Sequence, residues 1–585
     1  MSSSGACWLV ISIPYDLLMG EISLAGKQQF SATDWEQATA AVLRKIRMLS
    51  PDAPDHEVWD ALASKTLDGL KISALGTADL QYSPTGDPGS APFARGTRTE
   101  TTGWDIRARH LVADNKQILA DLVGGATSIW LFVSNPAEIE TALADVLLDI
   151  APVALEPVGD PLEIAKAFVE FSTGNQVHPA TNFGANQDSD QVLEIAQLAL
   201  VNSVLGFSID GTLVNDQGAS DVQELAYALL AGVKLLRQLE AGGIEPGVAA
   251  KLIEFKFSAS DEQLPTIAKF RAARRLWNRV GELCGVPDFA QRQHAVTSRA
   301  MLTKYDPYVN MLRTTVAAFS AGVAGADAVT VIEFDDPLGL PEPFSRRIAR
   351  NTSHLLLNES HVGKVVDPAG GSHVIEKLTD DMATAAWELF GQLDAEENRD
   401  ELLAGLIEKT SSQRQQLIAH REMPITGVSE FPNLAEVLPE RKSQPAYVRQ
   451  PNRYAAAFEA MRDEPPNLPI FLATLGSLAQ HTARATFVNN LFAAGGIAVV
   501  TAGATSDVAE LLKAYEAANK PKVVCVASSD AVYEQWGADA ISALRSAGAE
   551  HVIVAGKNDL PADDRAVAKM DALEFLAKTR AKVQS

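Results

Sequence analysis

Short β-branched segments alternate with longer helical segments over two stretches of this chain, residues 60–394 and residues 468–585. Such alternation favours a parallel sheet, because a helix must carry the chain back to the edge where the next parallel strand begins. The length of the first stretch suits a closed (β/α) barrel, and the second suits a small doubly wound sheet. The sequence therefore predicts an α/β protein in which a TIM barrel precedes a flavodoxin-like domain.

The strongest strand signals are short runs rich in Val, Ile and Phe. They fall at 128–133, 203–209, 251–257 and 328–332 in the first stretch, and at 470–475, 497–500, 523–527 and 552–555 in the second. The clearest helices between them span 221–239 and 264–284, where apolar residues recur at helical spacing.

The same patterns divide the chain into four parts. Residues 1–55 form an N-terminal arm with an amphipathic helix at 30–50, which Ser31 or Thr33 caps, with Glu36 at capping-box spacing from Thr33. Residues 56–400 form the barrel and residues 467–585 the doubly wound domain. Residues 401–466 are first helical and charged and then irregular, as expected of a linker that wraps over the barrel.

Charge and cysteine content exclude several classes of function. The net charge of −24 is spread along the chain, which argues against nucleic-acid binding but leaves pockets for small anions open. The three cysteines lie far apart without metal-binding spacing, so we expect a reducing, cytoplasmic location and no metal site. No apolar run reaches the ~20 residues of a membrane span. The run Cys7–Ile13 is short and follows no basic residue, so we expect no signal peptide; a start codon assigned too far upstream explains it equally well.

Eight segments of the predicted barrel stand out, in this order along the chain: Ala91–Gly96, Trp104–Arg107, Gln217–Ala226, Thr266–Trp277, His294–Ser298, Asp306–Thr315, Arg347–Thr352 and Val366–Ser372. From residue 91 to residue 372, these segments with their order and spacing resemble the methylmalonyl-CoA mutase family. Within the family, Ile425–Pro432 and the divergent last domain are most similar to the small (β) subunit of the bacterial heterodimeric enzyme.

The resemblance implies a fold and a reaction. Family members interconvert (R)-methylmalonyl-CoA and succinyl-CoA with adenosylcobalamin. The acyl-CoA threads the barrel axis, and cobalamin lies between the barrel and the last domain. The radical chemistry belongs to the cofactor, while the protein positions the reactants and excludes water.

The catalytic positions of the family are replaced here. The family's Tyr-His pair falls on Thr212 and Leu213, and its second active-site tyrosine falls on Arg109. A leucine cannot donate a hydrogen bond to a thioester carbonyl, and an arginine places a charge where the family has a neutral phenol. We therefore expect no catalytic residues on this chain.

The cobalamin-binding positions are replaced as well. The family's Asp-x-His-x-x-Gly motif falls on Leu478, Gln480 and Ala483, and a preceding lysine falls on Thr474. Axial ligation of cobalt needs an imidazole oriented by a carboxylate, and neither is present. His481 is one residue late, and we expect it on a surface loop. Two later turns of the motif become Ala527–Ser529 and Ala555–Gly556. We thus expect no cofactor on this chain.

Four polar positions match sites near the CoA-binding side of the family's barrel: Arg107, Arg271, Arg274 and His294. One interpretation is residual binding of the anionic groups of acyl-CoA. The other is structural, with Arg271 and Arg274 paired to acidic neighbours. The segment Asp367–Ser372 is expected to be a tight turn with no helix start after its glycines.

Three hypotheses remain. The first is a non-catalytic small subunit that pairs with a larger catalytic mutase chain, which itself binds adenosylcobalamin. The second is a self-sufficient acyl-CoA mutase with an altered site. The third is an acyl-CoA binding module. Cobalamin binding by the isolated chain separates the second from the others, and co-purification with a larger homologue separates the first from the third.

Overall fold

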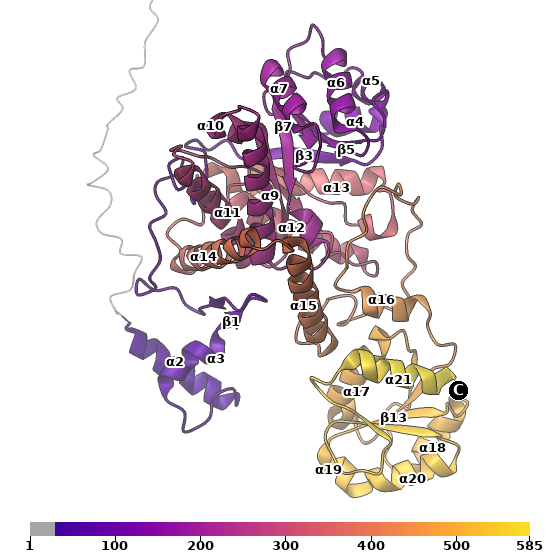
Figure 1. Cartoon of the computed structure of the whole chain (residues 1–585). Helices are drawn as coiled ribbons and strands as arrows, with labels where there is room; N and C mark the ends of the chain where they lie inside the picture. Colours follow the sequence, from indigo (N-terminus) through magenta and orange to yellow (C-terminus); the bar gives the residue numbers. More distant parts are fainter. Residues whose placement is uncertain (1–29, 585) are drawn as a thin grey trace, which may run out of the picture. The chain divides into compact units, whose positions relative to one another are not determined.

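The computed structural model describes residues 30–584 (Figure 1). It consists of two compact units. The first holds the described residues up to Lys65 together with Lys71–Leu75, and the second holds Thr66–Leu70 and everything from Gly76 onward. The apolar run Cys7–Ile13 and the rest of the predicted arm before residue 30 lie outside the described residues.

The first unit is a small helical unit with its own core. Helix α2 (Ala32–Lys45) is followed by η1 (Asp55–Glu57), α3 (Val58–Leu62) and the short antiparallel strands β1 (Ser64–Lys65) and β2 (Lys71–Ile72). Ser31 caps α2 and shares its capping box with Asp34, so the alternative of Thr33 with Glu36 is wrong. The helix also ends at Lys45, earlier than residue 50.

Eight parallel strands close into the predicted barrel, in the order β10-β3-β4-β5-β6-β7-β8-β9. The fold class is confirmed. The strands are β3 (Asp105–His110), β4 (Ser128–Val133), β5 (Val153–Pro157), β6 (Asn182–Ala185), β7 (Leu205–Asp210), β8 (Ile253–Ala259), β9 (Arg292–Thr297) and β10 (Ala328–Thr330).

Helices cover the outside of the barrel (Figure 1). They are α4 (Asn115–Val123), α5 (Glu138–Leu143), α6 (Pro161–Phe171), α7 (Val192–Asn202), α9 (Asp221–Ala241), α11 (Gln263–Leu283), α12 (Asn310–Val323) and α13 (Pro343–His354), with short α8 (Thr212–Asn215) and α10 (Pro246–Ala249) between them. The core between helices and sheet is aromatic in part, since Trp277 of α11 packs edge-on against Phe255 of β8 at 4.7 Å.

Two long helices follow the barrel, α14 (His373–Ala395) and α15 (Arg399–Ala419). The expectation that no helix starts after the glycines of Asp367–Ser372 is wrong. Ser372 adopts an extended conformation, and α14 begins at the next residue. Asp367 stabilises the turn by forming an ion pair with Arg95, at 2.7 Å.

The linker after α15 contacts the mouth of the barrel. Arg441 pairs with Asp335 at 2.7 Å, and the amide of Leu340 donates to the carbonyl of Lys442 at 2.6 Å. Gln444 donates to the carbonyl of Asp336 at 3.0 Å. Residues 456–463, predicted to be irregular, form helix α16 (Ala456–Asp463) instead.

The last domain is a parallel sheet in the order β12-β11-β13-β14-β15, which is the flavodoxin-like order. Its strands are β11 (Ile470–Thr474), β12 (Val499–Thr501), β13 (Val523–Ala527), β14 (His551–Ala555) and β15 (Asp564–Ala566). Its helices are α17 (Leu478–Ala494), α18 (Val508–Ala517), α19 (Asp530–Val532), α20 (Ala538–Ser546) and α21 (Ala572–Gln584). β15 was not predicted, because it is short and charged. Between residues 30 and 584, no helix has the length and apolarity that crossing a membrane demands.

Candidate functional site

A polar cavity of about 260 Å³ opens at the carboxyl ends of the barrel strands. This end carries the active site in (β/α) barrels generally, since the loops that follow the strands converge there. Strand residues from β3 to β9 form its floor, and Tyr447, Val448 and Arg449 of the linker line its open side. Three of the replaced family positions, Arg109, Thr212 and Leu213, line this same cavity.

Lys256 of β8 lines the floor of the cavity. Its ammonium contacts the carboxylates of Glu156 at 2.6 Å and Asp210 at 3.0 Å, and lies 4.6 Å from the ring centre of Trp130. Burial disfavours the charged form, but Asp210 and Glu156 outweigh it and raise the pKa of Lys256. The indole of Trp130 also donates to Glu156 at 2.9 Å. Lys256 is therefore held as a cation among fixed partners.

Arg109 lies at the edge of the cavity and is fully engaged by acidic side chains. Its guanidinium contacts Glu333 at 3.0 Å and Asp336 at 2.5 Å, and only 2% of its side chain is exposed. Arg299 binds the other oxygen of Asp336 at 3.1 Å. Burial opposes ionisation of Asp336, but Arg299 and Arg109 prevail and lower its pKa to about 2. The charge of Arg109 is thus neutralised within the protein.

Thr212 and Leu213 form the first turn of α8, directly after β7. The amide and hydroxyl of Thr212 both donate to Asp210, at 3.0 and 2.6 Å. Leu213 lines the cavity with a side chain that has no polar atom. Neither residue offers an unused donor of the kind that a phenol and an imidazole would supply.

Arg107 and His294 lie inside the barrel and not among the residues that line the mouth cavity. Arg107 contacts Glu254 at 2.7 Å across the barrel and donates to the hydroxyl of Ser128 at 3.2 Å. His294 contacts Thr330 through Nε2 at 2.7 Å. Burial, aided by Arg107, lowers the pKa of His294 well below its ordinary value. This histidine is neutral at physiological pH.

Arg271 and Arg274 lie on α11, in the helical layer outside the strands. Arg271 contacts the carboxylates of Asp367 and Glu376, the latter at 2.6 Å. Arg274 donates to the carbonyl of Phe93 at 2.8 Å, and burial together with the nearby Arg271 lowers its pKa to about 9. The structure therefore divides the four polar family positions between the barrel interior and the helical layer.

In the last domain, the side chain of Gln480 contacts the start of its own helix, α17. Its side-chain oxygen accepts hydrogen bonds from the amide and hydroxyl of Ser477, at 2.8 and 2.9 Å, which forms the capping box of α17. Leu478 is 67% exposed, and Thr474 is buried with its hydroxyl bound to the carbonyl of Gly503. Ligand and orienting carboxylate are both absent from these positions.

His481 does not lie on a surface loop, and this prediction was wrong. It belongs to the first turn of α17 and is only 4% exposed, because it falls on the face of the helix that also buries Val488. Its Nδ1 is buried without a hydrogen-bond partner. An axial ligand must project into space that a corrin ring can enter, and this side chain does not.

Arg484 connects the two later turns of the expected cobalamin site. It donates to the carbonyl of Ser528 at 2.6 Å and pairs with Asp530 at 2.7 Å. Arg484 also lies close to Gly556: a Cβ atom added at Gly556 would be 2.9 Å from the Nε of Arg484. The residues present at these positions do not fit a cobalamin site. Across residues 30–584, no group of His, Cys, Asp and Glu has the geometry of a metal site.

Comparison with known proteins decides the family. The model of the methylmalonyl-CoA mutase family matches residues 193–520. The methylmalonyl-CoA mutase small subunit of Streptomyces virginiae is 39% identical over 93% of this chain and 95% of its own length. This chain belongs to the methylmalonyl-CoA mutase family. The small subunit of Propionibacterium freudenreichii subsp. shermanii is 33% identical over 96% of this chain, and the Escherichia coli K12 methylmalonyl-CoA mutase is 35% identical over 38% of it.

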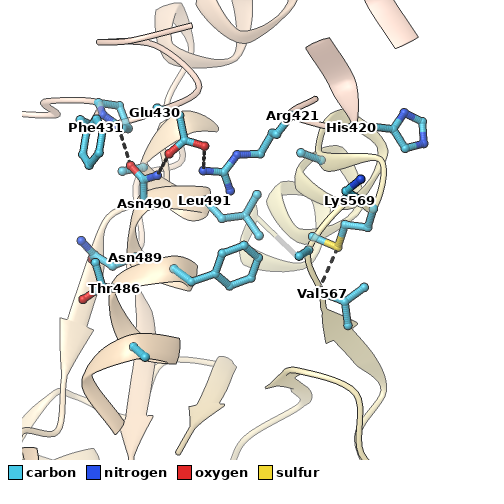
Figure 2. Close-up of a pocket in the computed structure, with 17 residues that line it drawn as sticks. His420, Arg421, Glu430, Phe431, Thr486, Asn489, Asn490, Leu491, Val567 and Lys569 are labelled. Carbon is cyan, nitrogen blue, oxygen red and sulfur yellow. Dashed lines mark hydrogen bonds and ion pairs between the residues drawn. The ribbon is translucent and has the colours of Figure 1, made fainter. Parts of the chain in front are cut away.

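This mutase chain has a second, larger groove of about 650 Å³ between the end of α15, the linker and the last domain (Figure 2). Arg421 reaches Glu430 on one side, and the amide of Phe431 donates to Asn490 at 2.7 Å. Lys569 and His420 lie on the opposite side (Figure 2). Ala483, at the glycine position of the cobalamin motif, lines this groove, whereas Leu478 and Gln480 do not.

Three residues at the centre of the mutase barrel were missed by the sequence analysis: Glu156, Asp210 and Lys256. A signal was present in β8, where Glu254, Lys256 and Ser258 alternate with phenylalanines. Alternate positions of a barrel strand face inward, so polar residues at this spacing indicate a polar interior. Their pairing partners lie on other strands and carry no comparable local signal.

Proposed function

We propose that this chain is the non-catalytic small subunit of an adenosylcobalamin-dependent methylmalonyl-CoA mutase. It pairs with a longer homologous chain and stabilises it. The longer chain binds adenosylcobalamin, which supplies the radical, and isomerises methylmalonyl-CoA and succinyl-CoA. The small subunit, which is the chain described here, contributes no reacting group.

The engagement of Arg109 by Glu333 and Asp336 carries this proposal. An arginine at a substrate-facing position can take a new role only if its charge is available to an anion. Here two buried carboxylates already satisfy that charge. Leu213, which lines the same cavity, has no polar atom with which to donate a hydrogen bond to a thioester.

The last domain supports the same conclusion. Gln480 stabilises the start of α17, and Arg484 ties the turns at Ser528 and Gly556 together. Both side chains stabilise the protein where the family binds a cofactor. We infer that cobalamin binds to the larger chain alone, and that any acyl-CoA binding by this barrel is weak, because Arg107 and His294 are already bound within it.

The pairing itself rests on ancestry. The full-length relatives are named small subunits, and such a name presupposes a larger one. A duplicated chain that keeps its dimer interface can lose its own chemistry while its partner retains it. The scattered cysteines, with Cys284 exposed and free, suit a cytoplasmic complex.

Co-expression with the candidate partner tests the proposal. The partner is the longer mutase homologue from the same genome that retains Asp-x-His-x-x-Gly. We expect a 1:1 complex by size exclusion with light scattering, and an interface of more than roughly 2,000 Å². Each chain is also incubated with adenosylcobalamin, desalted and examined by visible spectroscopy. We expect the corrinoid spectrum and succinyl-CoA formation only where the longer chain is present.

Two results would overturn this proposal. One is a stoichiometric corrinoid spectrum, or mutase activity, with this chain alone. The other is separate elution of the two chains at micromolar concentration.

A further inference from the structure

Part of the linker crosses the open side of the mouth cavity and is anchored to the barrel on both sides of the crossing. Before the crossing, Arg441 pairs with Asp335 at 2.7 Å. After it, the amide of Asn452 donates to the carbonyl of Asp216 at 2.7 Å. Residues 446–450 lie between these anchors, and three of them line the cavity. The two anchors thus keep this short segment over the mouth of the barrel.

Side chains hold residues 446–450 against the barrel. The ring of Tyr447 stacks on that of Phe132, with 6.3 Å between the ring centres, and its hydroxyl donates to the carbonyl of Leu111. Arg299 donates to the carbonyl of Arg449 at 2.6 Å. In the part of the chain that the structure describes, these two hydrogen bonds and one ring stack join the segment to the barrel. All three can be lost while the anchors on either side remain.

The same segment is bonded within itself. The amide of Val448 donates to the carbonyl of Pro445 at 3.0 Å, and the side chain of Gln450 donates to that of Gln444 at 3.3 Å. Pro445 and Pro451 lie on either side of it, and a proline has no amide hydrogen to donate to the barrel. A turn that is bonded internally and weakly held at its borders moves as one body.

The cavity beneath this segment is closely covered. Val448 lines the cavity and is 7% exposed, and Ser208 of β7, which also lines it, is 8% exposed. This end of a (β/α) barrel normally admits the ligand, because the loops after the strands build the site there. Loops that close over such a site exclude water and control entry.

We propose that residues 446–450 form a lid over the mouth cavity, and that this lid must open before a small molecule can enter. The inference does not depend on the proposed function, because it concerns access to the cavity and neither the chemistry inside it nor pairing with another chain. Hydrogen bonds and ring contacts of this kind are each weak, so the lid opens by a local change while the barrel stays folded.

The test measures how fast N-ethylmaleimide labels a thiol inside the cavity. Ser208→Cys supplies this thiol with little change of shape, in a chain that also carries Cys7→Ser and Cys284→Ser. Cys525 is kept, because it is buried in the last domain and its labelling reports global unfolding. Val123→Cys on α4, at a position that is 91% exposed, gives the rate of a freely accessible thiol.

We expect the thiol at position 208 to react at least about a hundredfold more slowly than the one at position 123. Tyr447→Phe keeps the ring and removes one hydrogen bond, which should raise the rate at position 208 roughly two- to tenfold. Tyr447→Ala removes the ring stack as well and should raise it further, because labelling follows the fraction of molecules with an open lid. Cys525 should stay unlabelled throughout.

Three results would overturn the lid. The thiol at position 208 reacts as fast as the one at position 123, or its rate is the same with Tyr447 and with Tyr447→Ala, or Cys525 is labelled in step with it. The last result would mean that the cavity opens only when the whole chain unfolds. Leu213→Cys provides a second thiol in the same cavity if Ser208→Cys does not fold, and urea unfolding curves of each variant decide that point.

Discussion

At the scale of single residues, two cations at the mouth of the barrel are each engaged by two carboxylates. Lys256 is bound by Glu156 and Asp210, and Arg109 by Glu333 and Asp336. Buried ion pairs contribute little net stability compared with apolar packing, but removing one member leaves the other uncompensated and costs several kcal/mol. These side chains therefore maintain the shape of the cavity at the barrel mouth.

Asp216, which also lines the cavity, makes stability depend on pH. Burial raises its pKa to about 7, with contributions from Asp210, Asp336 and Glu224, although Arg299 at 3.5 Å opposes the shift. Because the folded protein binds this proton more tightly than the unfolded chain, its contribution to stability is complete below about pH 4. It declines as the pH rises through about 7.

We expect Asp216→Asn to remove this dependence. At pH 4 the variant and wild type have similar free energies of unfolding, because the side chain is neutral in both. At pH 8 the variant is the more stable by roughly 2–4 kcal/mol, because each tenfold difference in proton affinity between the folded and unfolded states corresponds to about 1.4 kcal/mol. Arg299 retains Asp336 in the variant. Urea unfolding at both pH values measures the difference, and parallel pH profiles would contradict the assignment.

At the scale of elements, glycines in helices show where packing is tight and where it is open. Gly322 near the end of α12 lies against the indole of Trp104, whose ring would be 2.3 Å from a Cβ at this position. Trp104 is 6% exposed and its Nε1 donates to Ser353 at 3.3 Å, so the ring has little freedom to move. Gly391 of α14, in contrast, has nothing within 4 Å of the same position.

The two glycines are expected to respond in opposite directions to alanine. Gly391→Ala gains helix propensity without a clash and should raise the free energy of unfolding by about 0.5–1 kcal/mol. Gly322→Ala gains the same propensity but forces the indole to shift, and should lower stability by about 1–3 kcal/mol. Chemical denaturation of both variants provides the comparison. Equal shifts of the same sign would show that Trp104 does not restrict α12.

At the scale of the whole molecule, the proposed non-catalytic role rests on replacements in two domains. The barrel mouth has Leu213, Thr212 and Arg109 where the family has its reacting side chains, and the last domain has Leu478 and Gln480. Loss of one well-placed hydrogen-bond donor typically costs on the order of 3 kcal/mol of transition-state stabilisation, about a hundredfold in rate. Restoring the family's residues in one domain does not restore the interactions that are missing from the other.

We therefore expect the double variant Leu478→Asp with Gln480→His to form no succinyl-CoA from methylmalonyl-CoA. It should also be less stable by about 1 kcal/mol, because the histidine cannot complete the capping box with Ser477. Gln480→Glu is the matched control, since glutamate retains the cap. Activity assays and unfolding curves are measured side by side. Succinyl-CoA above the wild-type background would favour the alternative of a mutase with an altered site.

The sequence by itself determined the two parallel-sheet domains, since the alternation of strand and helix is a local pattern that each segment carries. It also determined that Leu213 and Leu478 offer no hydrogen-bond donor or ligand atom, because a leucine side chain has no polar atom in any environment. Only the tertiary structure decided how the polar residues are used. Arg107 meets Glu254 and Arg109 meets Glu333 across more than a hundred residues of chain, and no local pattern specifies such pairs. The burial of His481 and the exposure of Leu312 were likewise decided by which neighbours the fold places against each helix face.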